Sequence, residues 1–204
     1  MYRIFLNRKT LCCAQIKNVQ AMSNRCLKPS AYVKEFAEWF LEGFGLKQST
    51  NRAQKKINIV LICRKDYFAH PRKASKKVER KFRDDVEIEN VIAQIAIDGV
   101  DTKVRRVYLE DIDIKQQMQI MSTADVLIGV HGAGMTHALF LPQNSGVIEI
   151  VPSQYGGRIH FQYLSTWAGH VYTTIGASGP DDAITPNFDQ LKSALPTVIA
   201  KILN

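Results

Sequence analysis

The sequence predicts an α/β protein built on a doubly wound, mostly parallel, Rossmann-like sheet. Three observations predict this class. Short apolar runs alternate along the chain with segments whose apolar residues recur at helical spacing. The run at 57–64, "INIVLICR", is continuously apolar until its charged end, as expected of a strand covered on both faces. The segments between such runs are long enough to hold helices, which indicates right-handed βαβ units in an open sheet.

The first helix is expected over 31–45, "AYVKEFAEWFLEGFG". Its apolar residues keep helical spacing, and Gly43 or Gly45 ends it. Residues 1–28 show no clear periodicity, whereas the polar stretch at 46–56 is typical of a linker. The strand at 57–64 follows this linker, so the amphipathic helix precedes the sheet along the chain.

The remaining elements alternate between strands and helices. A helix is expected over 84–97, because its apolar residues recur every three or four positions. We predict further strands at 103–110, 125–130 and 146–151. We predict further helices at 112–124, at 135–140 and from about Phe188 to the end of the chain.

The composition is that of a soluble globular protein. With 204 residues, 46% of them hydrophobic and 23% charged, the chain can form one full domain and part of another. No run approaches the roughly 18 apolar residues of a membrane span, and "MYRIFLNRKTLCCAQ" at the start has only scattered apolar residues. We therefore predict neither a signal peptide nor a membrane anchor.

The net charge of +8 favours an anionic partner, which can be nucleic acid, a membrane surface or a phosphorylated small molecule. Much of the positive charge lies at 64–83, where a solvated loop and helix face is the plain alternative. Nucleic acid is disfavoured because this run lacks interleaved stacking aromatics. The cysteines, Cys12, Cys13, Cys26 and Cys63, lack zinc-site spacing, so we predict no metal and no cofactor. Cys63 is expected to be a buried thiol.

The stretch "IGVHGAGMTHALFLP" at 128–142 carries the candidate site. In an open α/β sheet, ligands bind beyond the carboxyl ends of the strands, where a tight turn leads into a helix. Gly132 and Gly134 remove side chains, so that a diphosphate can approach backbone N–H groups at the helix start. The alternative is a turn that needs glycine and nothing more. His131 and Thr136 can donate hydrogen bonds to phosphate, and Arg64, at the end of another strand, can grip it.

Glu149 interrupts the apolar strand at 146–151 and therefore needs a partner, either a ribose diol or a neighbouring arginine. Two familiar motifs are excluded. The turn is not the G-x-G-x-x-G fingerprint of dinucleotide sites. The chain also contains no G-x-S-x-G nucleophile elbow, which excludes an esterase built around "HGAG".

These residues resemble glycosyltransferase family 61, which includes EGF-domain-specific O-GlcNAc transferases and plant xylosyltransferases. The similarity rests on "ADVLIGVHGAGMTHALFLPQNSGVIEI" at 124–150. Arg64 after the first strand, "RKFRDDVEI" at 80–88 and Gln117 support it. Two features depart from the family pattern: Asp84 replaces a frequent asparagine, and an insertion lengthens the loop after Arg64.

The resemblance implies the nucleotide-binding lobe of a two-lobed GT-B enzyme, with residues 51–204 as this domain and 1–50 as a remnant of the acceptor lobe and a linking helix. It implies an inverting transfer of N-acetylglucosamine or a pentose from a UDP-sugar to a hydroxyl of a protein or glycan, without a metal. His131 is the candidate catalytic residue, whereas His137 is expected to be structural. The resemblance implies that the donor contacts Arg64, Arg80, Gly132, Ala133, Gly134, Thr136 and Glu149.

The main alternative is a lobe that binds a nucleotide sugar and catalyses nothing. It is favoured by length, because two Rossmann-like domains need about 300–400 residues. The resemblance also implies the lumen of the ER or Golgi, and contact with a membrane only through an anchor that this chain lacks.

Overall fold

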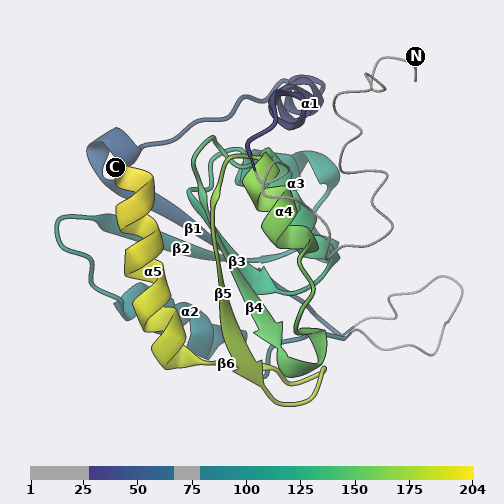
Figure 1. Ribbon diagram of the computed structural model, residues 1–204, viewed down its shortest axis with the longest axis vertical. Coiled ribbons are helices and arrows are strands. Elements are labelled where there is room, and N and C mark those ends of the chain that lie inside the picture. The colour runs from purple at the N-terminus through teal and green to yellow at the C-terminus, as the bar shows by residue number, and fades with distance from the viewer. Residues whose placement is uncertain (1–27, 67–78) are drawn as a thin grey trace, which may run out of the picture.

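The computed structural model describes residues 28–66 and 79–204 (Figure 1). Six strands form one sheet in the order β2-β1-β3-β4-β5-β6. They are β1 (Lys56–Cys63), β2 (Asp101–Tyr108), β3 (Val126–Val130), β4 (Gly146–Pro152), β5 (Val171–Ser178) and β6 (Thr185–Pro186). All neighbours in this sheet are parallel except β5 and β6. The mostly parallel Rossmann-like sheet is therefore confirmed, in one of the two common doubly wound orders.

Helices cover both faces of the sheet. α2 (Asp85–Gln94) and α5 (Phe188–Leu203) pack on one face (Figure 1). α3 (Ile114–Met121), the 3₁₀ segment η5 (Ala133–Phe140) and α4 (His160–Trp167) pack on the other. Three short 3₁₀ turns, η3 (Arg52–Gln54), η4 (Leu109–Asp111) and η6 (Ser153–Tyr155), join elements. Among the described residues, none of these helices is long and apolar enough to cross a bilayer.

The central strands are continuously apolar because both of their faces are covered. All residues of β3 are buried. Ile128 and Val130 of β3 point into the core beneath α2 and α5, whereas Leu127 points into the core beneath η5 and α4. Cys63 at the end of β1 is buried and has a free thiol, as expected, and burial raises its pKa. The other cysteines lie outside the described residues.

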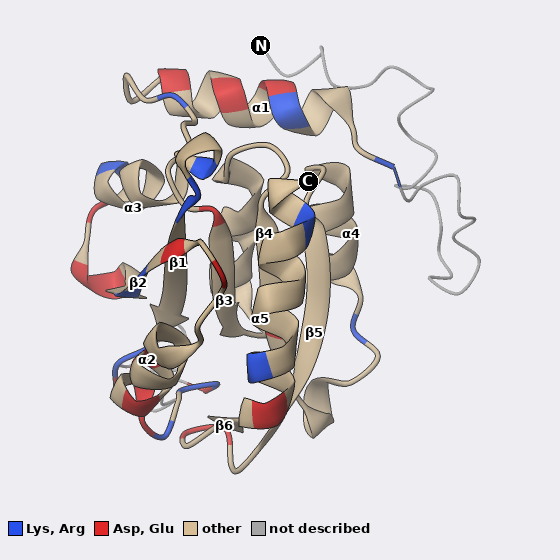
Figure 2. Cartoon of the chain, turned by 90° about the vertical axis from the view of Figure 1, so that its left-hand side faces the viewer, with Lys and Arg blue, Asp and Glu red and all other residues tan. Residues whose placement is uncertain are grey.

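Helix α1 (Ala31–Glu42) lies across the end of the sheet and packs on η5 (Figure 2). Its Phe36 and Phe40 rings contact Phe140, with centroids 6.4 and 5.0 Å apart. The predicted helix at 31–45 is therefore present, but it ends at Glu42. Because Phe140 also packs against the core beneath η5 and α4, α1 extends that core. The division of the chain at residue 50 stays a prediction.

The predicted elements occur in the expected order, with shifted ends. The helix expected at 84–97 ends at Gln94, and the one expected at 112–124 spans Ile114–Met121. The expected helix at 135–140 is the 3₁₀ segment η5, where the backbone N–H groups of Met135 and Leu141 donate to carbonyls three residues back, the 3₁₀ spacing. The sequence patterns did not predict α4, β5 and β6.

A buried ion pair ties the amino-terminal end of the sheet together. Asp125, which precedes β3 and has no solvent exposure, accepts a hydrogen bond from Nε of Arg52 at 2.6 Å. Its oxygens also accept from Thr50 Oγ1 at 2.6 Å and from the backbone N–H of Asn58 at 2.9 Å. Arg52 donates further to the carbonyls at 143 and 144 and to Ser145 Oγ. This pair links β1, β3 and the turn before β4.

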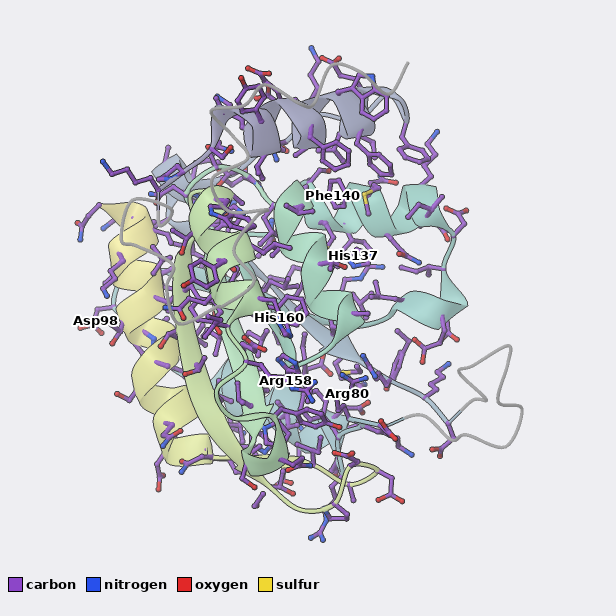
Figure 3. The ribbon with its side chains drawn as sticks, turned by 45° about the vertical axis from the view of Figure 1, so that its right-hand side comes forward. Arg80, Asp98, His137, Phe140, Arg158 and His160 are labelled. Carbon is purple, nitrogen blue, oxygen red and sulfur yellow. The ribbon has the colours of Figure 1, made fainter. Side chains whose placement is uncertain are left out.

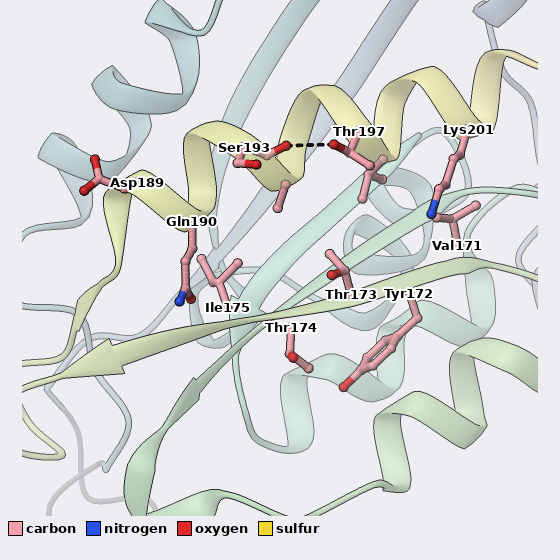
Figure 4. A pocket seen from close by; sticks show the side chains of 12 residues that line it. Val171, Tyr172, Thr173, Thr174, Ile175, Asp189, Gln190, Ser193, Thr197 and Lys201 are labelled. Carbon is pink, nitrogen blue, oxygen red and sulfur yellow. Dashed lines mark hydrogen bonds between the residues drawn. The ribbon is translucent and has the colours of Figure 1, made fainter.

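A groove of about 560 Å³ lies between β5 and α5 (Figure 4). Its lining is mixed, with Thr173 and Ile175 from the strand and Gln190 and Lys201 from the helix. The groove is on the face of the sheet that carries α5. The candidate site, in contrast, lies at the carboxyl edge of the strands, so the groove is separate from it.

His170 carries a prediction about stability. It is 9% exposed, its Nε2 donates to the carbonyl of Ala138 at 2.8 Å, and its Nδ1 accepts from the N–H of Ser145 at 3.3 Å. This neutral form is favoured because burial lowers the pKa of His170 from 6.5 to about 4. The unfolded chain therefore binds a proton first, and stability that is fully present above pH 6.5 is lost as the pH falls toward 4.

The loss attributable to His170 should approach about 3 kcal/mol in the free energy of unfolding. Urea denaturation at pH 7.5, 6, 5 and 4 measures it. The His170→Gln variant keeps a donor and an acceptor but does not titrate, so the difference between wild type and variant isolates this group. Equal pH dependence in the two proteins would contradict the assignment.

Candidate functional site

The carboxyl ends of β1 and β3 form the switch point of the sheet. These strands are neighbours, but β1 leads into α2 on one face and β3 leads into η5 on the other. In doubly wound sheets, this divergence leaves a crevice in which ligands bind. Arg64 follows β1 and His131 follows β3 directly. The predicted placement of both residues at the same edge is therefore confirmed.

Two guanidinium groups converge on Gly132. A Cβ atom at this glycine would lie 2.6 Å from Nη2 of Arg64 and 3.3 Å from Nη1 of Arg80. Arg64 also donates through Nη1 to the carbonyl of Glu79 at 2.8 Å, which fixes the segment before Arg80. The missing side chain at Gly132 thus leaves the space that both arginines occupy. The structure brings together three residues that the resemblance had assigned to one site.

Arg80 has two unusual features. Its backbone is left-handed, with φ of 64°, a conformation that costs a residue with a side chain about 1 kcal/mol or more. Its Nε is buried and has no hydrogen-bond partner among the described residues. A buried, unsatisfied N–H is unfavourable, and strained backbone tends to occur at functional positions. Both features fit a guanidinium that awaits an anionic ligand.

His131 is held by Glu149. The imidazole is 2% exposed, and its Nδ1 is hydrogen-bonded to Oε1 of Glu149, which has no exposure. Oε2 of the same carboxylate accepts from the hydroxyl of Tyr172. Burial lowers the pKa of His131, whereas the contact with Glu149 acts in the opposite direction. His131 precedes Gly132, the residue on which the two arginines converge.

The partners of Glu149 in the described part of the chain are His131 and Tyr172 rather than an arginine. The carboxylate is enclosed beneath these two side chains. The strand register explains this position, because β4 directs the side chain beneath His131. Contact between Glu149 and the donor stays a prediction.

The loop after β4 adds residues that the sequence reasoning missed. The ring of Tyr155 stacks on His131, with centroids 5.5 Å apart and planes 21° apart. The guanidinium carbons of Arg158 and Arg80 lie 4.8 and 5.3 Å from the Tyr155 centroid. His160 lies 5.2 Å from the ring of His131. Figure 3 shows Arg80, Arg158 and His160 gathered at this edge. Tyr155, Arg158 and His160 could have been found in the sequence from their position just after the strand that ends at Pro152, because this places them at the same carboxyl edge.

Ala133, Gly134 and Thr136, the expected donor contacts after Gly132, lie in different surroundings. A Cβ atom at Gly134 would lie 3.2 Å from Cγ2 of Ile62 and 3.5 Å from Leu109, so this glycine faces the core rather than the arginines. Thr136 is exposed and donates its hydroxyl to the carbonyl of Ala133 within η5. The hydroxyl of Thr136 is therefore engaged within η5, and its contact with the donor stays a prediction. Ala133 is exposed at the start of η5.

His137 belongs to the packing of η5. Its Nδ1 lies 3.0 Å from the carbonyl of Gly134, and its Nε2 lies 2.9 Å from Oε1 of Gln117. The amide nitrogen of Gln117 donates to the carbonyls of Leu109 and Ile112. Burial lowers the pKa of His137. The network joins α3, η4 and η5, so the structural role expected for His137 is confirmed.

The family model described as Glycosyltransferase 61 matches residues 27–148, more than half of the chain. This chain belongs to glycosyltransferase family 61. The matched region includes Arg64, Arg80 and the glycine turn, whereas Tyr155 and Arg158 lie beyond it.

Curated relatives agree with this membership. Beta-1,2-xylosyltransferase RCN11 of Oryza sativa subsp. japonica is 30% identical over 171 residues, which are 81% of this chain and 32% of the rice protein. Beta-1,2-xylosyltransferase of Arabidopsis thaliana is 27% identical, over 71% of this chain and 30% of that protein. The EGF domain-specific O-linked N-acetylglucosamine transferase of Drosophila melanogaster is 29% identical, over 65% of this chain and 21% of the fly enzyme. The family 61 chain thus spans about a third of the length of the plant relatives.

Proposed function

We propose that this family 61 chain supplies the donor-binding lobe of a GT-B enzyme, an inverting glycosyltransferase that moves a sugar from a UDP-sugar to a hydroxyl. The observation that carries the proposal is the convergence of Arg64 and Arg80 on Gly132 at the switch point of the sheet. Planar guanidinium groups bind phosphate oxygens through two parallel hydrogen bonds. Two of them side by side fit a diphosphate better than a single phosphate.

The chemistry of the leaving group explains why this arrangement suits glycosyl transfer. As the bond to the sugar breaks, negative charge grows on the departing diphosphate, and fixed positive groups stabilise it. Arg64 and Arg80 supply two such charges at Gly132, and Arg158 extends the positive surface beside Tyr155. His131 is the candidate catalytic residue, because an imidazolium there can donate a proton to a phosphate oxygen. We assign the chain no metal.

The relatives suggest the range of sugars and acceptors. Their names describe transferases of xylose, of arabinose and of N-acetylglucosamine. We propose a UDP-linked pentose or N-acetylglucosamine as donor and a protein or glycan hydroxyl as acceptor. Such a protein would work in the lumen of the ER or Golgi. The activity belongs to the whole protein, whereas donor binding is assigned to this chain.

Isothermal titration of the purified chain with UDP tests the proposal. We expect UDP to bind more tightly than UMP, because the β-phosphate reaches the second arginine, and we expect equal affinity with and without manganese. ADP controls for recognition of the base. Equal affinities for UDP and UMP would contradict the diphosphate assignment, and a requirement for manganese would contradict the metal-free site.

The two glycines of the turn provide a separate prediction. Gly132→Ala is expected to weaken UDP binding at least tenfold, about 1.4 kcal/mol, because its Cβ would displace the arginines. Gly134→Ala is expected to leave affinity within twofold, about 0.4 kcal/mol, because its Cβ would meet Ile62 and Leu109 instead. Titration calorimetry of both variants, with circular dichroism to verify folding, measures the contrast. Equal losses would mean that both glycines serve only the turn.

A further inference from the structure

Three side chains form a continuous hydrogen-bonded series that leads from the sheet interior to the site. The hydroxyl of Tyr172 on β5 donates to Oε2 of Glu149 on β4, and Oε1 of Glu149 contacts Nδ1 of His131 after β3. Glu149 has no solvent exposure. A buried carboxylate is strongly unfavourable unless its oxygens are bonded, and here both oxygens are. Because the three residues come from adjacent strands, their arrangement is fixed by the sheet.

The strand register explains why the series is uninterrupted. Glu149 pairs with Gly129 of β3, so no β3 side chain fills the space next to the carboxylate on that side. Tyr172 of β5 pairs with Val147 of β4. Val147 is two residues before Glu149, so the side chains of Val147, Glu149 and Tyr172 lie on the same face of the sheet. Figure 4 shows the Tyr172 ring directed away from α5, which is the face that carries Glu149.

The series determines the tautomer of His131. An ionised carboxylate oxygen only accepts hydrogen bonds, so Nδ1 of His131 must carry the hydrogen. Burial raises the pKa of Tyr172, which therefore keeps its proton and donates it to Glu149. Nε2 of His131 has no hydrogen-bond partner among residues 28–66 and 79–204. The nitrogen opposite Glu149 thus has an unused hydrogen-bonding position.

We propose that Tyr172 and Glu149 are positioning residues that keep His131 protonated on Nδ1, so that Nε2 is the atom that meets the donor diphosphate. This inference rests on the proposed function and assigns Glu149 and Tyr172 roles behind the site rather than in it. Phosphate oxygens also only accept hydrogen bonds, so Nε2 must gain a proton when the diphosphate binds. The carboxylate of Glu149 compensates the charge of the resulting imidazolium.

Other groups around His131 also influence its protonation. Tyr155 of η6 stacks on the imidazole, and His160 of α4 lies 5.2 Å from it between ring centroids. Arg158 lowers the pKa of His131 through its charge, as does His160. The side chains of Arg64 and Arg80 converge on Gly132, the next residue along the chain. Glu149 raises the pKa of His131 through both its hydrogen bond and its charge, so removing that charge should lower this pKa.

Nitrogen-15 NMR of the histidine side chains in the ligand-free chain tests the tautomer directly. We expect Nδ1 of His131 to be protonated at pH 8 in the wild type. Glu149→Gln keeps the shape but removes the charge, and should lower the pKa of His131 by at least about one unit, a tenfold change in proton affinity. Tyr172→Phe should increase the population protonated on Nε2, because the carboxylate loses the bond that orients it. Tyr163→Phe, which removes a hydroxyl from α4, is the matched control.

Titration calorimetry with UDP separates this inference from the proposed function. In the wild type we expect proton uptake on binding, seen as different binding enthalpies in buffers of different ionisation enthalpy. Glu149→Gln should weaken UDP binding about tenfold at pH 6.5 and at pH 8, because His131 of the free chain is mostly neutral at both, with less effect at a pH low enough to protonate His131 before UDP binds. An unchanged tautomer and pKa of His131 in both Glu149→Gln and Tyr172→Phe would overturn the positioning role, whatever UDP does. The NMR measurements need no ligand, so they test the positioning role separately from UDP binding. Failure of UDP to bind the wild type would overturn only the proposed function.

Discussion

Replacing Arg64 and Arg80 together with alanine is expected to weaken UDP binding by about 2–6 kcal/mol, which would bring the affinity below detection by calorimetry. Each guanidinium supplies charge-assisted hydrogen bonds worth about 1–3 kcal/mol to a phosphate. Both lie within contact distance of the space above Gly132. Because they flank one small volume, a diphosphate that loses both keeps only the turn, His131 and the charge of Arg158.

Titration calorimetry of the double variant and of each single variant measures this loss. The double variant Lys103→Ala/Arg105→Ala is the matched control, since it removes the same charge from exposed positions on β2. A similar loss in that control would show that binding follows net charge rather than the site. Single variants whose losses add without coupling would contradict a shared ligand, because residues that hold one group are expected to be non-additive.

Arg52→Ala is expected to lower the free energy of unfolding by about 3–5 kcal/mol, the usual cost of leaving a buried charge without its partner. Asp125 has no exposure and keeps only two of its hydrogen bonds in this variant, those from Thr50 and the backbone of Asn58. The carbonyls at 143 and 144 lose their donor as well. The turn before β4 should therefore loosen together with the start of β3.

Urea denaturation followed by circular dichroism measures this effect. Arg105→Ala removes an arginine from an exposed position and is expected to change stability by less than about 0.5 kcal/mol. UDP binding should survive Arg52→Ala at temperatures where the variant is folded, because Arg52 lies at the opposite edge of the sheet from Arg64. A loss below about 1 kcal/mol would mean that solvent satisfies Asp125 and that the pair is not buried in solution.

The positions of the central strands and of the glycine turn were predictable from the sequence. The runs that form β1, β3 and β4 are mostly apolar because helices cover both faces, and this pattern is visible in a short window of sequence. Strand β5, next to the two-residue edge strand β6, was missed because it is only partly buried and has no such run. Helix α4 was missed because eight residues are too few to establish a helical period.

The sequence by itself determined that Arg64 and His131 each follow the end of a strand, since strand ends and turns are local features. Only the tertiary structure decided that Gly132 faces two arginines while Gly134 faces Ile62, because neither glycine has a side chain whose chemistry reveals its direction. It also decided that Glu149 supports His131 from below. Such contacts join residues that are far apart in the chain. They depend on the register of the strands, which the local sequence does not reveal.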